Sequence, residues 1–280
     1  MCRLYGITGN QPARLECSLV EAQNALLRQS VSDSRGIANP DGWGIGIYEH
    51  GIPVVHKSSR AAAHDVDFRD TAERVVSRNS IAHVRAATIG SSGLDNTHPF
   101  SHGPWLFAHN GTLSGFDVLE TELEAEIPDH LLRQRRGETD SELVFLWLLS
   151  RMPTQGLDSL SGADSVQDII ALLAGAVPEL SNRAAAIASE PARLNLLLSD
   201  GVHLAASRWG NGLFLTERAG RTDCEVCRST HLSGPGESGY RAVAVASEPI
   251  TRENWIEVAD RSFIGATNGH TVGVMAAHAA

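Results

Sequence analysis

MCRLYGITG, residues 1–9, is the stretch that decides how this chain of 280 residues is organised. Leu4 and Ile7 alternate with smaller groups, which predicts a short strand with Cys2 at the end of a sheet. Removal of Met1 would leave a thiol and a free α-amine on Cys2. Because a free thiol titrates near ~8.5 and an α-amine near ~7.7–8.0, this amine can act as the base for its own thiol near neutral pH.

Residues later in the chain supply the other groups that such a nucleophile needs. The segments are 41–44 (DGWG), 83–88 (HVRAAT), 96–100 (NTHPF), 109–111 (HNG) and 137–142 (GETDSE). Together with residues 1–3, and in this order, they resemble the class II glutamine amidotransferase domain, an N-terminal-nucleophile (Ntn) hydrolase. The resemblance is strongest over residues 2–150. Residues 246–249 (ASEP) and Trp255 resemble the distal part of the stand-alone bacterial members.

The hydrophobic pattern predicts a mixed α and β domain with strands at both ends of the chain and helices in the middle. Strands are expected at 2–9, 43–48, 53–57, 81–85, 105–109, 194–198, 202–207, 213–216, 240–246 and 263–266, and helices at 19–27, 67–78, 166–173 and from Asp140 onward. Thr139 and Glu142 form a capping-box pattern before that last helix. The resemblance implies an α+β fold, a four-layer αββα sandwich of two antiparallel sheets. Residues 1–280 are expected to form a single domain, with the distal strands in 190–280.

The resemblance also implies roles for individual residues. Cys2 would be the nucleophile, and the Asn110 side-chain amide and the Gly111 backbone N–H would stabilise the oxyanion of the tetrahedral intermediate. Arg85 would bind the substrate carboxylate, since a guanidinium offers two parallel donors, and Asp140 would bind the ammonium. Each of these residues also has an ordinary structural explanation, such as a turn at Asn-Gly or a carboxylate at a helix N-terminus.

Three more residues are expected near the substrate. Thr88 matches the threonine that follows the binding arginine of the family and could hydrogen-bond the same carboxylate. His98, which precedes Pro99, would order a loop, and Trp43 would pack beneath the nucleophile, although a core tryptophan is the simpler account. The chain has alanine at 86 and isoleucine at 89, where several family members carry an aromatic residue and histidine, so closure over the substrate is an open question.

Composition and charge exclude several classes of function. A formal net charge of −10 disfavours nucleic acid as a partner, because nucleic-acid binding normally needs a basic face. Lys57 is the one lysine, and no phosphate-binding loop sequence is present, so neither ATP chemistry nor another cofactor is expected. No apolar run of about 18 residues indicates a membrane span, and no signal peptide is recognised, so a cytoplasmic enzyme is expected.

The cysteines leave one metal question open. Cys224 and Cys227, with His231 nearby, could supply three zinc ligands, but no obvious fourth ligand accompanies them. A reduced surface loop is the preferred interpretation, a redox pair is a weaker one, and no metal is predicted.

The leading hypothesis is an enzyme that cleaves the γ-amide of glutamine, or another γ-glutamyl amide, through a γ-glutamyl thioester on Cys2, with release of ammonia or an amine. The alternative within the family is a γ-glutamyl peptide or thiol amidohydrolase, as in glutathione breakdown or ergothioneine synthesis. Any site that uses the ammonia must lie on another chain, a synthase or amidotransferase partner. An alternative of another class is a non-catalytic amino-acid sensor. A papain-type protease or a metalloenzyme fits less well, because their signatures are missing.

Overall fold

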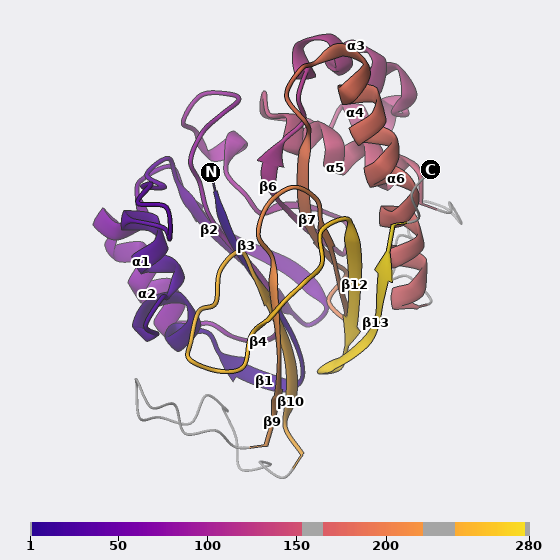
Figure 1. Ribbon diagram of the computed structural model, residues 1–280. Helices are drawn as coiled ribbons and strands as arrows, with labels where there is room; N and C mark the ends of the chain where they lie inside the picture. Colours follow the sequence, from indigo (N-terminus) through magenta and orange to yellow (C-terminus); the bar gives the residue numbers. More distant parts are fainter. Residues whose placement is uncertain (1, 153–164, 221–238, 278–280) are drawn as a thin grey trace.

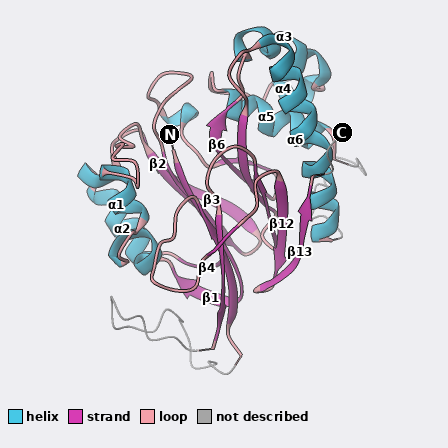
Figure 2. Ribbon diagram, in the orientation of Figure 1, coloured by secondary structure: helices cyan, strands magenta, loops and turns pink. Residues whose placement is uncertain are grey.

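A computed structural model describes residues 2–152, 165–220 and 239–277. Two antiparallel sheets stack face to face, and helices cover the outer face of each (Figures 1 and 2). The strands are β1 (Arg3–Arg14), β2 (Trp43–Glu49), β3 (Ile52–Ser58), β4 (Val76–Val84), β5 (Phe100–His102), β6 (Trp105–Thr112), β7 (Arg193–Ser199), β8 (His203–Arg208), β9 (Phe214–Ala219), β10 (Arg241–Ala246), β11 (Ile256–Glu257), β12 (Ser262–Thr267) and β13 (His270–Ala276). The α-helices are α1 (Leu26–Val31), α2 (Val66–Arg74), α3 (Phe116–Glu126), α4 (Asp129–Leu132), α5 (Asp140–Ser150) and α6 (Val166–Ile187); shorter helical turns are η1 (Cys17–Glu21), η2 (Ala62–His64) and η3 (Leu94–Asn96). The predicted αββα sandwich is confirmed.

The first strand occupies the middle of its sheet. The larger sheet has the order β11-β9-β10-β1-β4-β2-β3, and the smaller has the order β13-β12-β8-β7-β6-β5. Because β1 pairs with β10 on one side and β4 on the other, its backbone is hydrogen-bonded along both edges. Arg3 lies opposite Val84, so Cys2 sits beside the segment that follows β4. The strand predicted for residues 2–9 therefore has Cys2 at the sheet end, as expected.

Three hydrophobic clusters separate the four layers. Leu4, Ile81 and Leu106 belong to the cluster between the two sheets. A second cluster, around Trp43 and Phe68, fills the space between the larger sheet and α1 and α2. The third and largest cluster lies between the smaller sheet and α3, α5 and α6. Helix α5 belongs entirely to this cluster, because it is buried nearly all round, with polar residues confined to its ends.

Two predicted helices are corrected by tertiary pairing. The helix expected at 19–27 is broken into η1 and α1, because the backbone N–H of Asn24 donates to the carbonyl of Ile250 and draws the chain out of helical geometry. The helix expected at 67–78 ends at Arg74. Val76 and Ser77 instead pair with the far end of β1 and extend β4. Local propensity was overruled by a long-range backbone hydrogen bond in the first helix and by strand pairing in the second.

The other predicted helices and strands agree with the structure in some places and differ from it in others. The hairpins β2–β3 and β7–β8 are confirmed, and α5 begins at Asp140 as predicted. Its capping box is half formed: the Thr139 hydroxyl accepts from the N–H of Glu142, but the Glu142 carboxylate accepts from Arg136 and Gly137 instead. The helix expected at 166–173 runs on to Ile187, and α3 was not predicted at all. Within the described ranges, no helix combines the length and apolar character needed to cross a membrane.

Gly44 lets β2 pass against the segment that precedes β5. A Cβ atom at Gly44 would lie 2.1 Å from the carbonyl oxygen of His98, which is far inside any contact distance. We expect Gly44→Ala to cost about 1–3 kcal/mol of unfolding free energy, because the overlap is with backbone and cannot be relieved by a rotamer change. Urea unfolding followed by circular dichroism measures this.

The matched control for Gly44→Ala is Gly175→Ala on the exposed side of α6, where an added Cβ meets nothing within 4 Å. This control should gain about 0.5–1 kcal/mol, because alanine is the better helix former. Equal urea midpoints for Gly44→Ala and the unmodified protein would contradict the packing described here.

Candidate functional site

Cys2 presents its sulfur to the segment that follows β4. Its Sγ lies 3.3 Å from both the carbonyl oxygen and the nitrogen of Ala86, so the thiol donates to the oxygen while the N–H of Ala86 donates to the sulfur. Only 9% of Cys2 is exposed. Burial raises the pKa of the Cys2 thiol, and the hydrogen bond from Ala86 opposes this without cancelling it. The thiol is therefore protonated at neutral pH and needs a base before it can act as a nucleophile.

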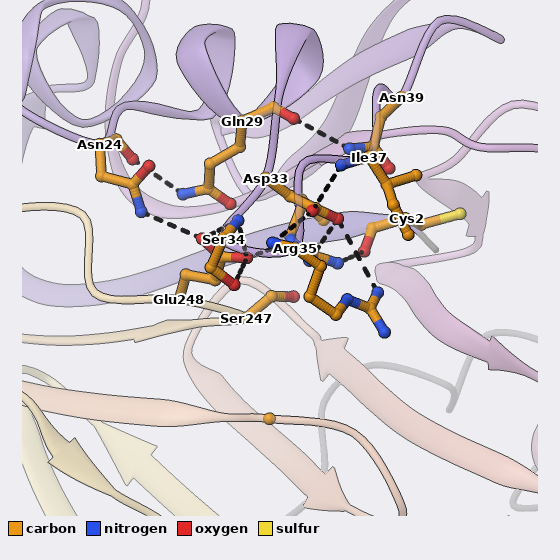
Figure 3. A network of polar contacts seen from close by, with 12 residues as sticks. Cys2, Asn24, Gln29, Asp33, Ser34, Arg35, Ile37, Asn39, Ser247 and Glu248 are labelled. Carbon is orange, nitrogen blue, oxygen red and sulfur yellow. Dashed lines mark hydrogen bonds and ion pairs between the residues drawn. The ribbon is translucent and has the colours of Figure 1, made fainter.

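The backbone of Cys2 is held by a buried ion network made of Arg3, Asp33 and Glu248, called here the Arg3 network. Arg3 is 4% exposed. Its Nη1 donates to the carbonyl oxygen of Cys2 at 2.8 Å, its Nε donates to Glu248 Oε1 at 2.8 Å, and its Nη2 donates to Asp33 Oδ2 at 2.5 Å. Arg3 comes from β1, Asp33 from the loop after α1 and Glu248 from the segment after β10. Figure 3 shows Asp33 and Glu248 together with Cys2. One cation thus fastens three distant parts of the chain around residue 2.

Both carboxylates of the Arg3 network stay ionised despite their burial. Burial alone would raise the pKa of Asp33, but hydrogen bonds from the N–H groups of Ile37 and Arg35, and the charge of Arg3, hold that pKa below its usual value. For Glu248, burial is likewise outweighed by the hydroxyl and N–H of Ser34 and by Arg3, so its pKa is also lowered. Buried charges that are paired and hydrogen-bonded in this way are costly to break singly.

Asn110 lies close to the first strand on its other side. Its Nδ2 donates to Ser247 Oγ at 3.0 Å, and the same oxygen accepts from the backbone N–H of Leu4 at 3.0 Å. The backbone carbonyl of Asn110 accepts a hydrogen bond from Asn211 Nδ2 at 2.9 Å. Asn110 Oδ1 is buried and finds no hydrogen-bond partner among the described residues. Ser247 therefore connects Asn110 of the smaller sheet to β1 of the larger one.

Gly111 is required by the close approach of the neighbouring strand. A Cβ atom at this position would lie 1.8 Å from the carbonyl oxygen of Arg193 on β7. His109, two residues earlier, is buried, with Nδ1 2.9 Å from Ser141 Oγ and Nε2 2.8 Å from the same Arg193 oxygen. Both ring nitrogens of His109 have a hydrogen-bond partner, so His109 is a packed and hydrogen-bonded residue.

Arg85 and Asp140 are both buried and already hold backbone groups. The Arg85 guanidinium donates to the carbonyls of Ser91 (3.0 Å) and Ile89 (2.9 Å), so it shapes the loop that follows β4. Asp140, in the first turn of α5, accepts from the N–H of Leu113 at 2.7 Å. A hydrogen bond of this kind to a carboxylate at a helix N-terminus is locally stabilising. These contacts fix where the cation and the anion lie.

Thr88 lies between the loop and the end of β6. Its Oγ1 is 3.2 Å from Thr112 Oγ1, and the neighbouring Ala87 donates its N–H to Asp41 Oδ2 at 2.8 Å. The loop is therefore tied both to β6 and to the segment before β2. Of the residues that the sequence grouped as catalytic or head-binding, Cys2 precedes β1, Arg85 and Thr88 follow β4, Asn110 and Gly111 lie on β6, and Asp140 begins α5.

Trp43 and His98 are placed in the interior. The indole N–H of Trp43 donates to Asp65 Oδ2 at 3.0 Å, and its ring packs edge-on against Phe68 in the core beneath α2. The substrate contact expected of Trp43 has no support from this position. His98 is 3% exposed and packs against the ring of His83 with centroids 4.3 Å apart. Burial lowers the pKa of both histidines, that of His83 to about 3, so both are neutral at physiological pH.

The residues considered as zinc ligands lie outside the described part of the chain. Cys224, Cys227 and His231 lie outside the described residues, as does Met1. Among the residues that are described, no three histidine, cysteine, aspartate or glutamate side chains gather closely enough to hold a metal ion.

Sequence reasoning missed the roles of Asp33, Ser247 and Glu248. Asp33 belongs to a polar segment (32–36) in which no pattern singles out one residue. Ser247 and Glu248 belong to a segment (246–249) that is noticed only for its resemblance. A usable signal was present: Arg3 is a charged residue inside a predicted strand, and a charge buried in a strand needs a carboxylate partner. Only the pairing of β1 with β10 identifies which carboxylate it is.

The comparison with known protein families agrees with this geometry. The model for "Glutamine amidotransferases class-II" matches residues 1–280. The chain belongs to the class II glutamine amidotransferase family. It is 29% identical to the probable glutamine amidotransferase DUG3 of Saccharomyces cerevisiae, over 94% of this chain and 81% of that protein. It is also 29% identical to the γ-glutamyl-hercynylcysteine sulfoxide hydrolase of Mycobacterium tuberculosis, over 95% of this chain and 93% of that protein. Membership of this family makes the chain an enzyme.

Solved structures show the same fold. A glutamine aminotransferase class-II domain protein from Silicibacter pomeroyi superposes with a TM-score of 0.64 at 23% identity, covering 99% of this chain and all of that one. A predicted glutamine amidotransferase from Pseudomonas aeruginosa superposes with a TM-score of 0.62 at 24% identity, over 97% of this chain and all of its own. The two-sheet architecture of this class II member is therefore that of the family.

The Arg3 network makes stability depend on acid pH. Because the folded-state pKa values of Asp33 and Glu248 lie below the unfolded ones, their contribution is complete above about pH 4–5 and is lost as the pH falls through the folded values. We expect Glu248→Gln to lose about 2 kcal/mol at pH 7, where a charged hydrogen-bond partner of Arg3 is removed. Its stability should also fall less steeply than that of the unmodified protein below about pH 4. Urea midpoints between pH 3 and pH 7 measure both effects.

A suitable control for Glu248→Gln is Asp129→Asn, since the Asp129 side chain is 89% exposed and pairs only weakly with Arg133. This change should leave the midpoints nearly unaltered. If Glu248→Gln matched the unmodified protein in both midpoint and pH dependence, the network would not be what holds residue 2 in place.

Proposed function

We propose that this family member cleaves γ-glutamyl amides with Cys2, freed of Met1, as the nucleophile, and that glutamine is the simplest of its substrates. The observation that carries the proposal is the position of the Cys2 sulfur, which hydrogen-bonds with Ala86 in the segment that also holds Arg85. Asn110 and Gly111 lie on β6, where Ser247 joins Asn110 to the backbone of Leu4, and Asp140 begins α5. Removal of Met1 is part of the proposal. Without the α-amine of residue 2, the described residues offer the protonated thiol no evident base.

The first half of the reaction forms a thioester. The α-amine of Cys2 accepts the thiol proton, and Sγ attacks the γ-carbonyl carbon of the substrate. Negative charge then develops on the carbonyl oxygen, which the Asn110 amide and the N–H of Gly111 stabilise; a donor of this kind contributes about 2.7–4 kcal/mol. The carbon–nitrogen bond breaks, the α-ammonium of Cys2 gives its proton to the leaving nitrogen, and ammonia or an amine departs.

Water completes the cycle. The α-amine takes a proton from the attacking water, whose oxygen adds to the thioester carbon. The carbon–sulfur bond then breaks, the proton returns to sulfur, and glutamate is released. No electrons are transferred in either half, so this mechanism requires no redox cofactor. The Arg3 network supports both halves by fixing the carbonyl of Cys2, and with it the direction of the amine and the thiol.

Arg85, Asp140 and Thr88 would recognise the amino-acid head. The α-carboxylate of the substrate would bind the guanidinium of Arg85 with help from Thr88, and its α-ammonium would bind Asp140. The contacts already made by Arg85 and Asp140 keep this cation and anion fixed before substrate arrives. Preorganisation of this kind lowers the cost of ordering the site on binding.

A second candidate within the same chemistry is hydrolysis of γ-glutamyl peptides or thiols, with an amine rather than ammonia as the leaving group. It is favoured by the similarity over nearly the whole chain to a protein named as a γ-glutamyl-hercynylcysteine sulfoxide hydrolase. The sensor hypothesis differs from both, because a sensor would bind the amino acid without a free Cys2 amine.

Substitution of the nucleophile tests the proposal. We expect Cys2→Ala to lower hydrolysis of glutamine and γ-glutamyl dipeptides by at least about a thousandfold, as when a covalent nucleophile is removed. In the unmodified protein, 6-diazo-5-oxo-L-norleucine, a glutamine analogue with an electrophilic carbon, should label Cys2, as located by peptide mass spectrometry.

The matched control is Cys17→Ala, which removes a buried cysteine from the core beside α1. Its labelling at Cys2 should persist. Full activity of Cys2→Ala, or labelling at another residue, would overturn the proposed mechanism. Binding of glutamine without hydrolysis or labelling would support the sensor hypothesis instead.

A further inference from the structure

Asn96 is a buried amide that none of the proposed catalytic steps uses. It ends the short turn η3, and only 4% of it is exposed. Its Nδ2 donates to the carbonyl oxygen of Ser91 at 3.0 Å, and its Oδ1 accepts from the backbone N–H of Glu138 at 2.8 Å. One side chain therefore joins the loop after β4 to the segment just before α5.

Each of the two segments joined by Asn96 carries one of the charges proposed to bind the amino-acid head. The carbonyl of Ser91 that accepts from Asn96 also accepts from Nη1 of Arg85 at 3.0 Å. On the other side, Glu138 lies two residues before Asp140, which begins α5. The cation and the anion are therefore linked through a single amide.

Both charges act on the proposed nucleophile. Burial is the largest influence on the pKa of the Cys2 thiol, while the charge of Arg85 lowers that pKa and the charge of Asp140 raises it. An α-amino acid carries its carboxylate and its ammonium on one carbon, so the groups that bind them must keep one fixed separation. A misplacement of about 1 Å in such a site can cost about a hundredfold in rate.

The surroundings of the Asn96 amide leave it little room to move. A Cβ atom at Gly137 would lie 2.3 Å from Asn96 Oδ1, and one at Gly90 would lie 3.0 Å from its Nδ2. The carboxylate of Glu138 also accepts from the N–H and the hydroxyl of Ser91, but each of these contacts is exposed and 3.4 Å long. The shorter, buried bonds of Asn96 are the stronger link between the two segments.

We propose that Asn96 is a positioning residue that sets the separation of Arg85 and Asp140 and so selects substrates with an α-amino-acid head. The proposal rests on the proposed function, because these are the two charges that would bind that head. The bond to Ser91 holds the guanidinium side, and the bond to Glu138 holds the carboxylate side. Without Asn96 the two sides move independently, which weakens recognition of the head and leaves the thiol chemistry in place.

The test compares three amides with the same leaving group, ammonia. Glutamine has the whole head, glutaramate lacks the α-ammonium, and 4-aminobutanamide lacks the α-carboxylate. The unmodified enzyme should favour glutamine over each analogue in kcat/KM by about a hundredfold or more, because each analogue leaves a buried charge unpaired. Asn96→Ala should lower both preferences by about tenfold. γ-Glutamylglycine, glutarylglycine and 4-aminobutyrylglycine form the same set with glycine as the leaving group. The fraction of folded enzyme cancels in each ratio.

Asn96→Asp separates the two sides and replaces the alanine variant if that does not fold. An aspartate keeps an acceptor for the N–H of Glu138 but has no donor for the carbonyl of Ser91. The preference over 4-aminobutanamide, which reports on the Arg85 side, should therefore fall about tenfold, whereas the preference over glutaramate should change by less than about threefold. A merely structural role of Asn96 would not affect recognition of one charge more than the other.

The matched control is Asn10→Ala, because Asn10 also joins two backbone groups. Its Nδ2 donates to the carbonyl of Gly239 at 2.7 Å, and its Oδ1 accepts from the N–H of Arg241 at 2.9 Å. On β1 it lies roughly 20 Å beyond Arg3, given the rise of an extended strand. This change should leave both preferences unaltered.

The possible failures can be told apart. If both preferences survive in Asn96→Ala and in Asn96→Asp, Asn96 only supports the fold and the inference is wrong, while the proposed function stands. If the unmodified enzyme cleaves glutamine with neither preference, the roles given to Arg85 and Asp140 are wrong, and this inference with them. Failure to cleave any γ-glutamyl amide would overturn the proposed function itself.

Discussion

One buried guanidinium holds the site together. Arg3 is the residue next to the proposed nucleophile, and it binds the carbonyl of Cys2 while two carboxylates from distant segments bind Arg3. A cation buried in this way is tolerated because carboxylates pair with it, and removing either carboxylate leaves part of the buried guanidinium without its hydrogen-bond partner. The fold of the larger sheet and the position of residue 2 are therefore coupled: the loop after α1 and the segment after β10 must both be in place before the end of β1 is fixed.

The second constraint is the close contact between the two sheets. Ser247 binds the backbone of Leu4 in one sheet and the amide of Asn110 in the other, so the nucleophile strand and the proposed oxyanion donor keep a fixed relation. Within the smaller sheet, Gly111 lets β6 and β7 approach more closely than any side chain at that position would permit. Catalysis that depends on donors aimed at one oxygen needs this kind of rigid support. The loop after β4 lies beside residue 2, and Arg85 holds it in place by donating to the carbonyl of Ile89.

The sequence singled out the candidate catalytic and binding residues but not the residues that hold them in place. Cys2, Asn110, Gly111, Arg85 and Asp140 stand in short local motifs that a single sequence displays, and the structure brings them to neighbouring strand and helix ends. Tertiary pairing decided the rest. Asn24 leaves helical geometry because its backbone N–H donates to the carbonyl of Ile250. The last residues of the helix expected at 67–78 pair with β1 instead and form part of β4. The same holds for Asp33 and Glu248, which reach Arg3 from the loop after α1 and from the segment after β10 and which no local pattern identifies.

The central claim is that the amine and the thiol of residue 2 act together. The direct measurement compares two preparations of the same chain, one released from an N-terminal tag so that it begins at Cys2, and one in which Met1 is retained. Each is assayed for hydrolysis of a γ-glutamyl amide. The account predicts that the chain beginning at Cys2 is active and that retention of Met1 abolishes turnover, because an amide nitrogen cannot accept the thiol proton. Equal turnover by the two preparations would contradict it.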